Sequence, residues 1–147
     1  MKIRRAEARD LPSILAIEEL CFSREVAFPP DALSILLEDA TALVAEDGNL
    51  AGFVIGFVRG EAGKVVTLDV LPERRGEGLG RGLMVALEEE FAILGARASR
   101  LEVSIENRRA IALYADLGYS GAALLEDYYG PGEDALLMVK RLRRAGP

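Results

Sequence analysis

The chain has 147 residues, half of them apolar, and a formal net charge of −6 at neutral pH. This length is typical of one domain, residues 1–147, and the negative charge argues against non-specific nucleic-acid binding. No uncharged run approaches the roughly 18 residues needed to cross a membrane. A single cysteine, Cys21, excludes an internal disulfide, and we expect a cytoplasmic protein.

Histidine is absent from the sequence, which restricts the chemistry of any catalytic site. Ser-His and Cys-His nucleophilic pairs are excluded, as is a zinc site that contains histidine. The single cysteine argues against a structural zinc site as well, so we expect no metal. A general base must then be a carboxylate, a tyrosine, a lysine or a backbone group acting through water.

The first part of the chain predicts two helices and a β-hairpin. Asp10 is a predicted N-cap, and the apolar residues that follow it recur with helical spacing. Asp47-Gly48-Asn49 predicts the turn of the hairpin. The predicted elements are a strand over residues 3–8, a helix up to residue 20, a loop over 22–30, a helix from 31, and strands over 41–46 and 50–58.

In the second part, predicted strands alternate with predicted helices. Positions 79, 83, 87 and 91 are apolar at four-residue spacing, which predicts a long amphipathic helix, and Asn107 is the predicted N-cap of another. The predicted elements are strands over 63–70, 100–105, 119–126 and 134–141, and helices over 78–94 and 107–117. The pattern predicts a mixed α/β fold, with one twisted sheet of about seven strands and helices on both faces.

Residues 74–83, R-R-G-E-G-L-G-R-G-L, are the most informative stretch. Each glycine costs about 1 kcal/mol relative to alanine inside a helix, so four glycines here indicate a backbone requirement. Such a turn lets several N–H groups face one anion, and the helix N-terminus and the arginines add positive charge. We therefore expect a pyrophosphate site, with an ordinary Gly-rich turn as the alternative.

Two common phosphate-binding motifs do not match this stretch. A P-loop requires lysine after its last glycine, where this chain has Arg81. The dinucleotide motif G-x-G-x-x-G fails because Arg81 or Leu83 occupies the position of its third glycine when the motif begins at Gly76 or Gly78. The pattern [QR]-x-x-G-x-[GA] does match, as Arg75, Gly78 and Gly80, and it resembles the acetyl-CoA signature of the GNAT superfamily of N-acetyltransferases.

This resemblance implies the GNAT fold and acetyl-CoA as co-substrate. In GNAT proteins the central parallel strands splay apart, and the pantetheine arm of the cofactor enters the gap. By resemblance the gap lies between the strand that ends near Val70 and the strand over residues 101–105. The implied cofactor contacts are backbone groups of Leu68 and Val70 and the side chain of Asn107 for the pantetheine arm, and Arg75, Gly76, Gly78, Gly80 and Arg81 for the pyrophosphate.

Later motifs narrow the resemblance. Residues 101–107 read L-E-V-S-I-E-N, residues 110–114 read A-I-A-L-Y, and Y-Y and E-D-A follow at 128–129 and 133–135. Together they resemble the ribosomal-protein alanine N-acetyltransferase (RimI-type) family and its archaeal N-terminal acetyltransferase relatives. The resemblance is continuous over residues 65–138. It implies acetylation of the α-amine of a protein or peptide N-terminus, a ribosomal protein being one candidate.

Glu102 is the predicted general base. Along its strand it alternates with Leu101 and Val103, so it faces the other side of a central sheet, in a partly desolvated cleft. Burial raises the pKa of a carboxyl toward the range useful for a base, and a protonated amine must lose a proton before it attacks a thioester. The alternative is a glutamate that faces solvent from a half-exposed strand.

Tyr114 is the predicted general acid. It lies between Ile111 and Leu117 on the apolar side of its predicted helix. In the resembled family the matching tyrosine points at the cofactor sulfur and protonates the departing thiolate. The alternative is a tyrosine packed in the core, whose hydroxyl needs a partner there.

The resemblance also assigns the acceptor site to two loops. Tyr128 and Tyr129 would supply apolar walls and hydroxyls, and Glu133, with Asp134, negative charge near a cationic amine. The tryptophan that the family has in the first loop is absent, and Phe28 is the nearest substitute. The alternative for residues 126–134 is a tyrosine-rich hairpin tip held by its turn residues.

The predicted function is therefore acetyl-CoA-dependent N-α-acetylation by direct transfer in a ternary complex. Alternatives in the same class are a GNAT enzyme that acetylates a lysine side chain or a small amine. A non-catalytic acyl-CoA-binding domain and a nucleotide-binding α/β protein are alternatives from other classes. The sequence leaves open whether the protein is a monomer or a homodimer.

Overall fold

The computed structural model describes residues 1–21 and 40–143. The loop over 22–30, the helix predicted from residue 31 and the candidate acceptor residue Phe28 lie outside this part of the chain. Within it, no helix is long and apolar enough to cross a membrane.

One seven-stranded sheet runs through the molecule in the order β1-β2-β3-β4-β5-β7-β6. All neighbouring strands are antiparallel except β4 and β5, which are parallel, so the predicted mixed sheet is confirmed. The strands are β1 Lys2–Arg5, β2 Thr41–Asp47, β3 Asn49–Arg59, β4 Ala62–Val70, β5 Ala98–Ser104, β6 Ser120–Gly130 and β7 Glu133–Arg141. The helices are α1 Leu11–Cys21, α3 Leu79–Ile93 and α4 Arg108–Asp116.

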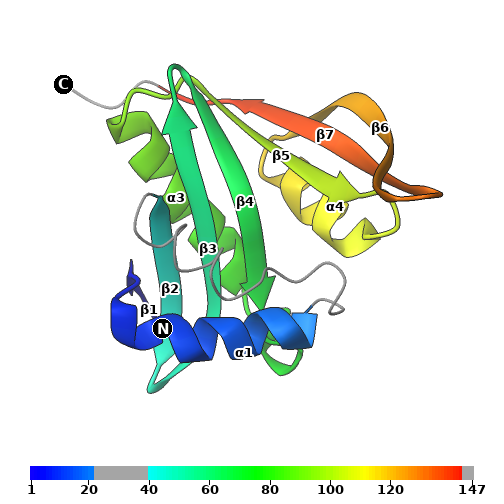
Figure 1. Ribbon diagram of the computed structural model, residues 1–147. Coiled ribbons are helices and arrows are strands. Elements are labelled where there is room, and N and C mark those ends of the chain that lie inside the picture. Colours follow the sequence, from blue (N-terminus) through cyan, green and yellow to red (C-terminus); the bar gives the residue numbers. More distant parts are fainter. Residues whose placement is uncertain (22–39, 144–147) are drawn as a thin grey trace.

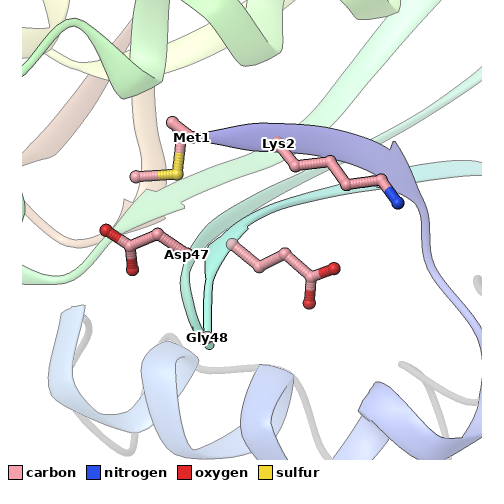
Figure 2. Close-up of a pocket in the computed structure, with 5 residues that line it drawn as sticks. Met1, Lys2, Asp47 and Gly48 are labelled. Atoms are coloured by element: carbon pink, nitrogen blue, oxygen red, sulfur yellow. The ribbon is translucent and has the colours of Figure 1, made fainter.

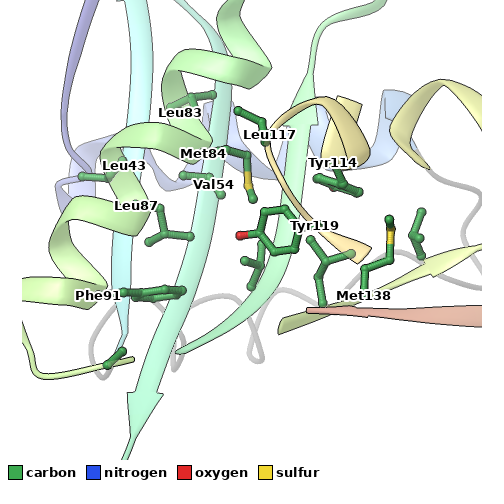
Figure 3. Packing of buried hydrophobic residues seen from close by; sticks show 14 of the residues in the cluster. Leu43, Val54, Leu83, Met84, Leu87, Phe91, Tyr114, Leu117, Tyr119 and Met138 are labelled. Atoms are coloured by element: carbon green, nitrogen blue, oxygen red, sulfur yellow. The ribbon is translucent and has the colours of Figure 1, made fainter. Parts of the chain in front are cut away.

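Helices cover both faces of the sheet, as the sequence predicts. Figure 1 shows α1 in front of β2–β4 and α3 behind them. Ile14 and Ile17 of α1 pack against Phe53 of β3 in one buried cluster. Leu87 and Phe91 of α3 belong to a second, larger cluster that also contains residues of β5, α4 and β7 (Figure 3).

Local signals explain where several elements begin and end. Asn107 Oδ1 accepts a hydrogen bond from Ala110 N at 3.1 Å, so the predicted N-cap of α4 is confirmed. Asp10 behaves differently from the prediction. It lies at the end of a 3₁₀ turn before α1, and its carboxylate accepts from Glu7 N at 2.7 Å and pairs with Arg4.

A β-bulge interrupts β4. Ile55 of β3 lies opposite Thr67 and Gly56 lies opposite Val65, so Val66 is an extra residue on β4. Since side chains alternate along a strand, one extra residue reverses which face the later side chains occupy. Before the bulge, Gly63 faces Phe91 of α3; after it, Leu68 is among the side chains that face α3.

The parallel pairing of β4 with β5 is short. Only three pairs form, Ala62↔Ala98, Gly63↔Ser99 and Lys64↔Arg100, although β4 continues to Val70 and β5 to Ser104. Over its full length β5 pairs instead with β7 on its other side. The two central strands therefore separate where the resemblance predicts the splay (Figure 1).

We expect the fold to require a glycine at position 63, at the closed end of this gap, because there is no room for a side chain. A Cβ at Gly63 would lie 2.3 Å from the ring of Phe91, which is itself fully buried. We expect Gly63→Ala to lower the free energy of unfolding by about 1–3 kcal/mol, the usual cost of overpacking a core. The measurement is urea unfolding followed by circular dichroism.

Gly82→Ala in α3 is the matched control. Its added Cβ would meet only the end of the flexible Ile3 side chain, at 3.2 Å, and alanine favours a helix interior. We expect this variant to be at least as stable as the wild type. Equal stability of Gly63→Ala and Gly82→Ala would show that the contact with Phe91 does not constrain the strand pair.

Candidate functional site

A cleft of about 1150 Å³ occupies the gap between β4 and β5. Its walls come from the ends of both strands, the turn before α3, the first part of α4 and the hairpin that joins β6 and β7. Every candidate site residue in the described part of the chain lines it: Leu68, Val70, Arg75, Gly76, Gly78, Gly80, Arg81, Glu102, Asn107, Tyr114, Tyr128, Tyr129 and Glu133.

The Gly-rich turn has the backbone shape expected of an anion site. Gly76 and Gly78 have φ values of +88° and +82°, and a Cβ at either position would meet nothing within 4 Å. The space over the first turn of α3 is therefore open, and the first N–H groups of a helix have no partner within it. Gly80 has another role, because a Cβ there would lie 3.2 Å from Leu113 of α4.

The arginines of the turn are engaged in different contacts. Arg74 is held by Asp47, at 2.7 Å, and by Glu77. Arg81 pairs with Asp116 at the end of α4. Arg75 folds back on the end of β4, where its Nε donates to the Val70 carbonyl at 3.2 Å and its Nη2 lies 3.7 Å from Cys21 Sγ. Arg75, Arg81 and the Val70 carbonyl thus contact other protein groups here, and their contacts with the cofactor stay predictions.

Glu102 lines the cleft with a side chain that is only 14 % exposed. It forms an ion pair with Lys64, a contact that sequence reasoning missed. Burial and, to a smaller extent, the charge of Arg100 lower the pKa of Lys64 to about 8. The ion pair with the Glu102 carboxylate acts on this pKa in the opposite direction, because it favours the charged lysine.

Tyr114 is buried between α4 and the cleft. Its ring lies edge-on to that of Tyr119, with 5.9 Å between the centroids. Burial first, and then the nearby charge of Asp69, raise the pKa of Tyr114 above its usual value, so its hydroxyl stays protonated. Tyr119 differs, because its hydroxyl bonds to Glu88 and Ser99 in the core and it is not among the cleft-lining residues.

The β6–β7 hairpin brings two tyrosines to the cleft. Tyr128 and Tyr129 lie edge-on with centroids 5.0 Å apart, and both are exposed. The hydroxyl of Tyr129 donates a long hydrogen bond, 3.4 Å, to the backbone carbonyl of Glu102. Asp127 holds the tip by accepting from Gly132 N at 2.8 Å. The hairpin is thus attached to the strand of the candidate base.

Two acids in the cleft were not singled out from the sequence. Glu18 of α1 and Asp69 of β4 are each 2 % exposed, and both line the cleft. Burial and contact with Glu18 raise the pKa of Asp69 to about 10, although Thr67 Oγ1 donates to Asp69 Oδ1 at 2.9 Å. An aspartate inside the apolar strand V-V-T-L-D-V was the available signal, because buried acids are rare without a role.

A second hollow, of about 400 Å³, lies at the β2–β3 turn beside the first residues of the chain (Figure 2). Its two acidic residues are engaged elsewhere: Glu46 with Arg4, and Asp47 with Arg74. None of the candidate site residues lines it. Among residues 1–21 and 40–143, no group of three or more acidic or cysteine side chains is arranged to hold a metal ion.

Comparisons with known proteins agree with this geometry. The sequence model of the acetyltransferase (GNAT) family matches residues 11–119, more than half of the chain. An uncharacterised N-acetyltransferase of Methanocaldococcus jannaschii is 35 % identical over 100 % of this chain and 96 % of its own. An N-alpha-acetyltransferase of Sulfurisphaera tokodaii is 29 % identical over 96 % of this chain and 93 % of its own.

The crystal structure of the ribosomal-protein-S18-alanine N-acetyltransferase from Escherichia coli superposes with a TM-score of 0.88. It is 29 % identical in sequence, and the match covers 99 % of this chain and 96 % of that one. Fold, splayed strands and Gly-rich turn thus agree with the sequence match. The chain belongs to the GNAT family and is an N-acetyltransferase.

Proposed function

We propose that the protein transfers the acetyl group of acetyl-CoA to the α-amine of a protein or peptide N-terminus, by direct attack in a ternary complex. The observation that carries this proposal is that Glu102 and Tyr114 line one cleft with the open N-terminus of α3. The names of the archaeal relative and of the Escherichia coli enzyme support the choice of an N-terminal acceptor.

Acetyl-CoA fits this cleft in two respects. The turn before α3 offers unpartnered N–H groups and a helix N-terminus to the pyrophosphate, around Gly76, Gly78 and Gly80. Beyond Lys64, the β4 edge that faces β5 makes no ladder hydrogen bonds with it. Backbone groups of Leu68 and Val70 on that edge are therefore suited to the amides of the pantetheine arm, once Arg75 leaves the Val70 carbonyl.

In the reaction the deprotonated amine attacks the thioester carbonyl, a C–N bond forms, and the C–S bond breaks. Glu102 accepts the proton of the amine directly or through a water molecule. Tyr114, kept protonated by burial, donates a proton to the departing thiolate. Tyr128, Tyr129 and Glu133 form the acceptor side of the cleft. No covalent enzyme intermediate is needed.

The Glu102 role is tested by thiol release from acetyl-CoA on short peptides with different free N-termini. N-terminally blocked peptides that contain lysine, and small amines, complete the panel. We expect turnover on free N-termini, and we expect Glu102→Gln to lower kcat by about 10²- to 10⁴-fold, the range for loss of a general base.

Glu106→Gln is the matched control. Glu106 also lines the cleft, but its side chain is exposed in the turn that follows β5. We expect nearly wild-type kcat from it. Turnover only on lysine or small amines would reject the N-terminal acceptor. An equal loss in both variants would reject the specific role of Glu102.

Tyr114→Phe should lower kcat by at least about 10²-fold and leave KM for acetyl-CoA almost unchanged, because only the proton donor is removed. Tyr119→Phe is the control. It removes the hydroxyl that bonds to Glu88 and Ser99, and should cost stability while kcat is retained. Steady-state kinetics and thermal unfolding of both variants measure this contrast. Full activity of Tyr114→Phe would assign the acid to another group.

The Lys64–Glu102 pair predicts a pH effect. Below about pH 8 Lys64 is charged and holds the Glu102 carboxylate; above it Lys64 is neutral and Glu102 is a better base. At each pH, the kcat/KM of the wild type is divided by that of Lys64→Met. This ratio cancels the effect of the acceptor amine's own titration. We expect this ratio to rise with pH through about 8.

Lys140→Met is the comparison for this pH profile, because Lys140 pairs with Glu88 away from the cleft. Its ratio to the wild type should not change with pH over the same range. A ratio that is also flat for Lys64→Met would show that Lys64 does not control the base.

A further inference from the structure

The buried acids Glu18 and Asp69 take no part in the reaction described above. They come from α1 and β4, elements separated in the sequence, and meet at the wall of the cleft. In the described part of the chain, no other group bonds to Glu18 Oε2 or Asp69 Oδ2, so these two oxygens have only the partner carboxyl beside them. Since burying a charge without an opposite charge is costly, a role in packing alone does not explain the pair.

The pair carries one negative charge at neutral pH. Two carboxylates in contact inside a protein cannot both ionise, so they share one proton. The raised pKa of Asp69 agrees with a shared proton. Burial is the largest cause of the rise, and Glu18 is the next. The remaining charge is spread over two carboxyl groups that belong to residues lining the cleft.

No ion pair in the described residues neutralises this charge. Arg75 is close enough to lower the pKa of Asp69 in part, but its guanidinium bonds to the Val70 carbonyl and contacts Cys21 Sγ. Thr67 gives Asp69 one neutral hydrogen bond. The pair is therefore suited to a cation that arrives from the cleft.

The pair also lies near the reaction centre. The charge of Asp69 raises the pKa of Tyr114, so the two side chains are within electrostatic reach. Asp69 is on β4 and Glu102 is on β5, the two strands that border the gap. An amine held between these strands would have the carboxyl pair on one side and the base on the other.

We propose that Glu18 and Asp69 form an anionic subsite that binds the ammonium group of the acceptor and positions it for deprotonation by Glu102. The inference rests on the proposed function only in requiring an amine acceptor. It applies equally to an N-terminal α-amine, a lysine side chain or a small amine. The ammonium would donate charge-assisted hydrogen bonds to the carboxyl groups of Glu18 and Asp69, two residues that line the cleft.

Amide substitutions separate charge from shape at this site. Glu18→Gln and Asp69→Asn each leave one carboxylate, and the new amide donates in place of the shared proton, so one negative charge remains. The double variant Glu18→Gln/Asp69→Asn is neutral. We expect the double variant to raise KM for the acceptor by roughly 10- to 100-fold, the range for one lost charge-assisted hydrogen bond.

The two single variants and the second substrate provide the controls. Each single variant should raise the acceptor KM by less than about threefold, because the charge remains. KM for acetyl-CoA should stay unchanged in all three variants, which a merely structural disturbance of the cleft would not allow. A wild-type acceptor KM in the double variant, or a parallel rise for acetyl-CoA, would overturn the proposal.

A binding measurement on the wild type covers the case in which the double variant does not fold. Calorimetry in the presence of CoA compares each acceptor with its des-amino analogue, in which hydrogen replaces the amine. We expect the amine to bind roughly 10- to 100-fold more tightly. Equal affinities, or binding of no amine at all, would refute the subsite.

These outcomes distinguish this inference from the proposed function. If lysine or small amines are acetylated and free N-termini are not, the N-terminal function fails. The same variants and des-amino analogues, applied to the accepted amine, then decide on the subsite separately.

Discussion

The hydrogen bonds that β4 and β5 do not form are the constraint on which the site depends. Their parallel ladder ends at Lys64↔Arg100, and the bulge at Val66 follows almost at once. A bulge bends and twists its strand, which directs the end of β4 away from β5. Because β5 keeps β7 as a partner along its whole length, the open edge belongs to the gap and does not destabilise the sheet.

The same extra residue decides which side chains border the gap. If β4 were a regular strand, without a bulge at Val66, strict alternation would place Thr67 and Asp69 on the face that Gly63 and Val65 share with α3. With it, Leu68 and Val70 lie near Gly80 of α3, and Asp69 meets Glu18 of α1. One inserted residue thus places an acid where a regular strand would have an apolar side chain.

The sequence predicted most of the elements, because hydrophobic spacing, glycines and the Asn107 cap are local signals. It also predicted which described residues share the cleft, since the resemblance covers the strands and turns that build it. Lys64 and Glu18 were missed for a physical reason. Their partners, Glu102 and Asp69, are 38 and 51 residues away in the sequence, and the register and the bulge that join them follow from tertiary packing.

The short parallel pairing of β4 with β5, which we call the seam, has a mechanical consequence. It divides the sheet into a part that carries the Gly-rich turn and a part that carries Glu102 with the tyrosine hairpin. From Lys64 to Val70 the strand extends about 20 Å, so a small rotation at the seam becomes a much larger displacement at the mouth of the cleft. A rotation of the strands where Gly63 meets Phe91 would therefore change the width available to the two substrates.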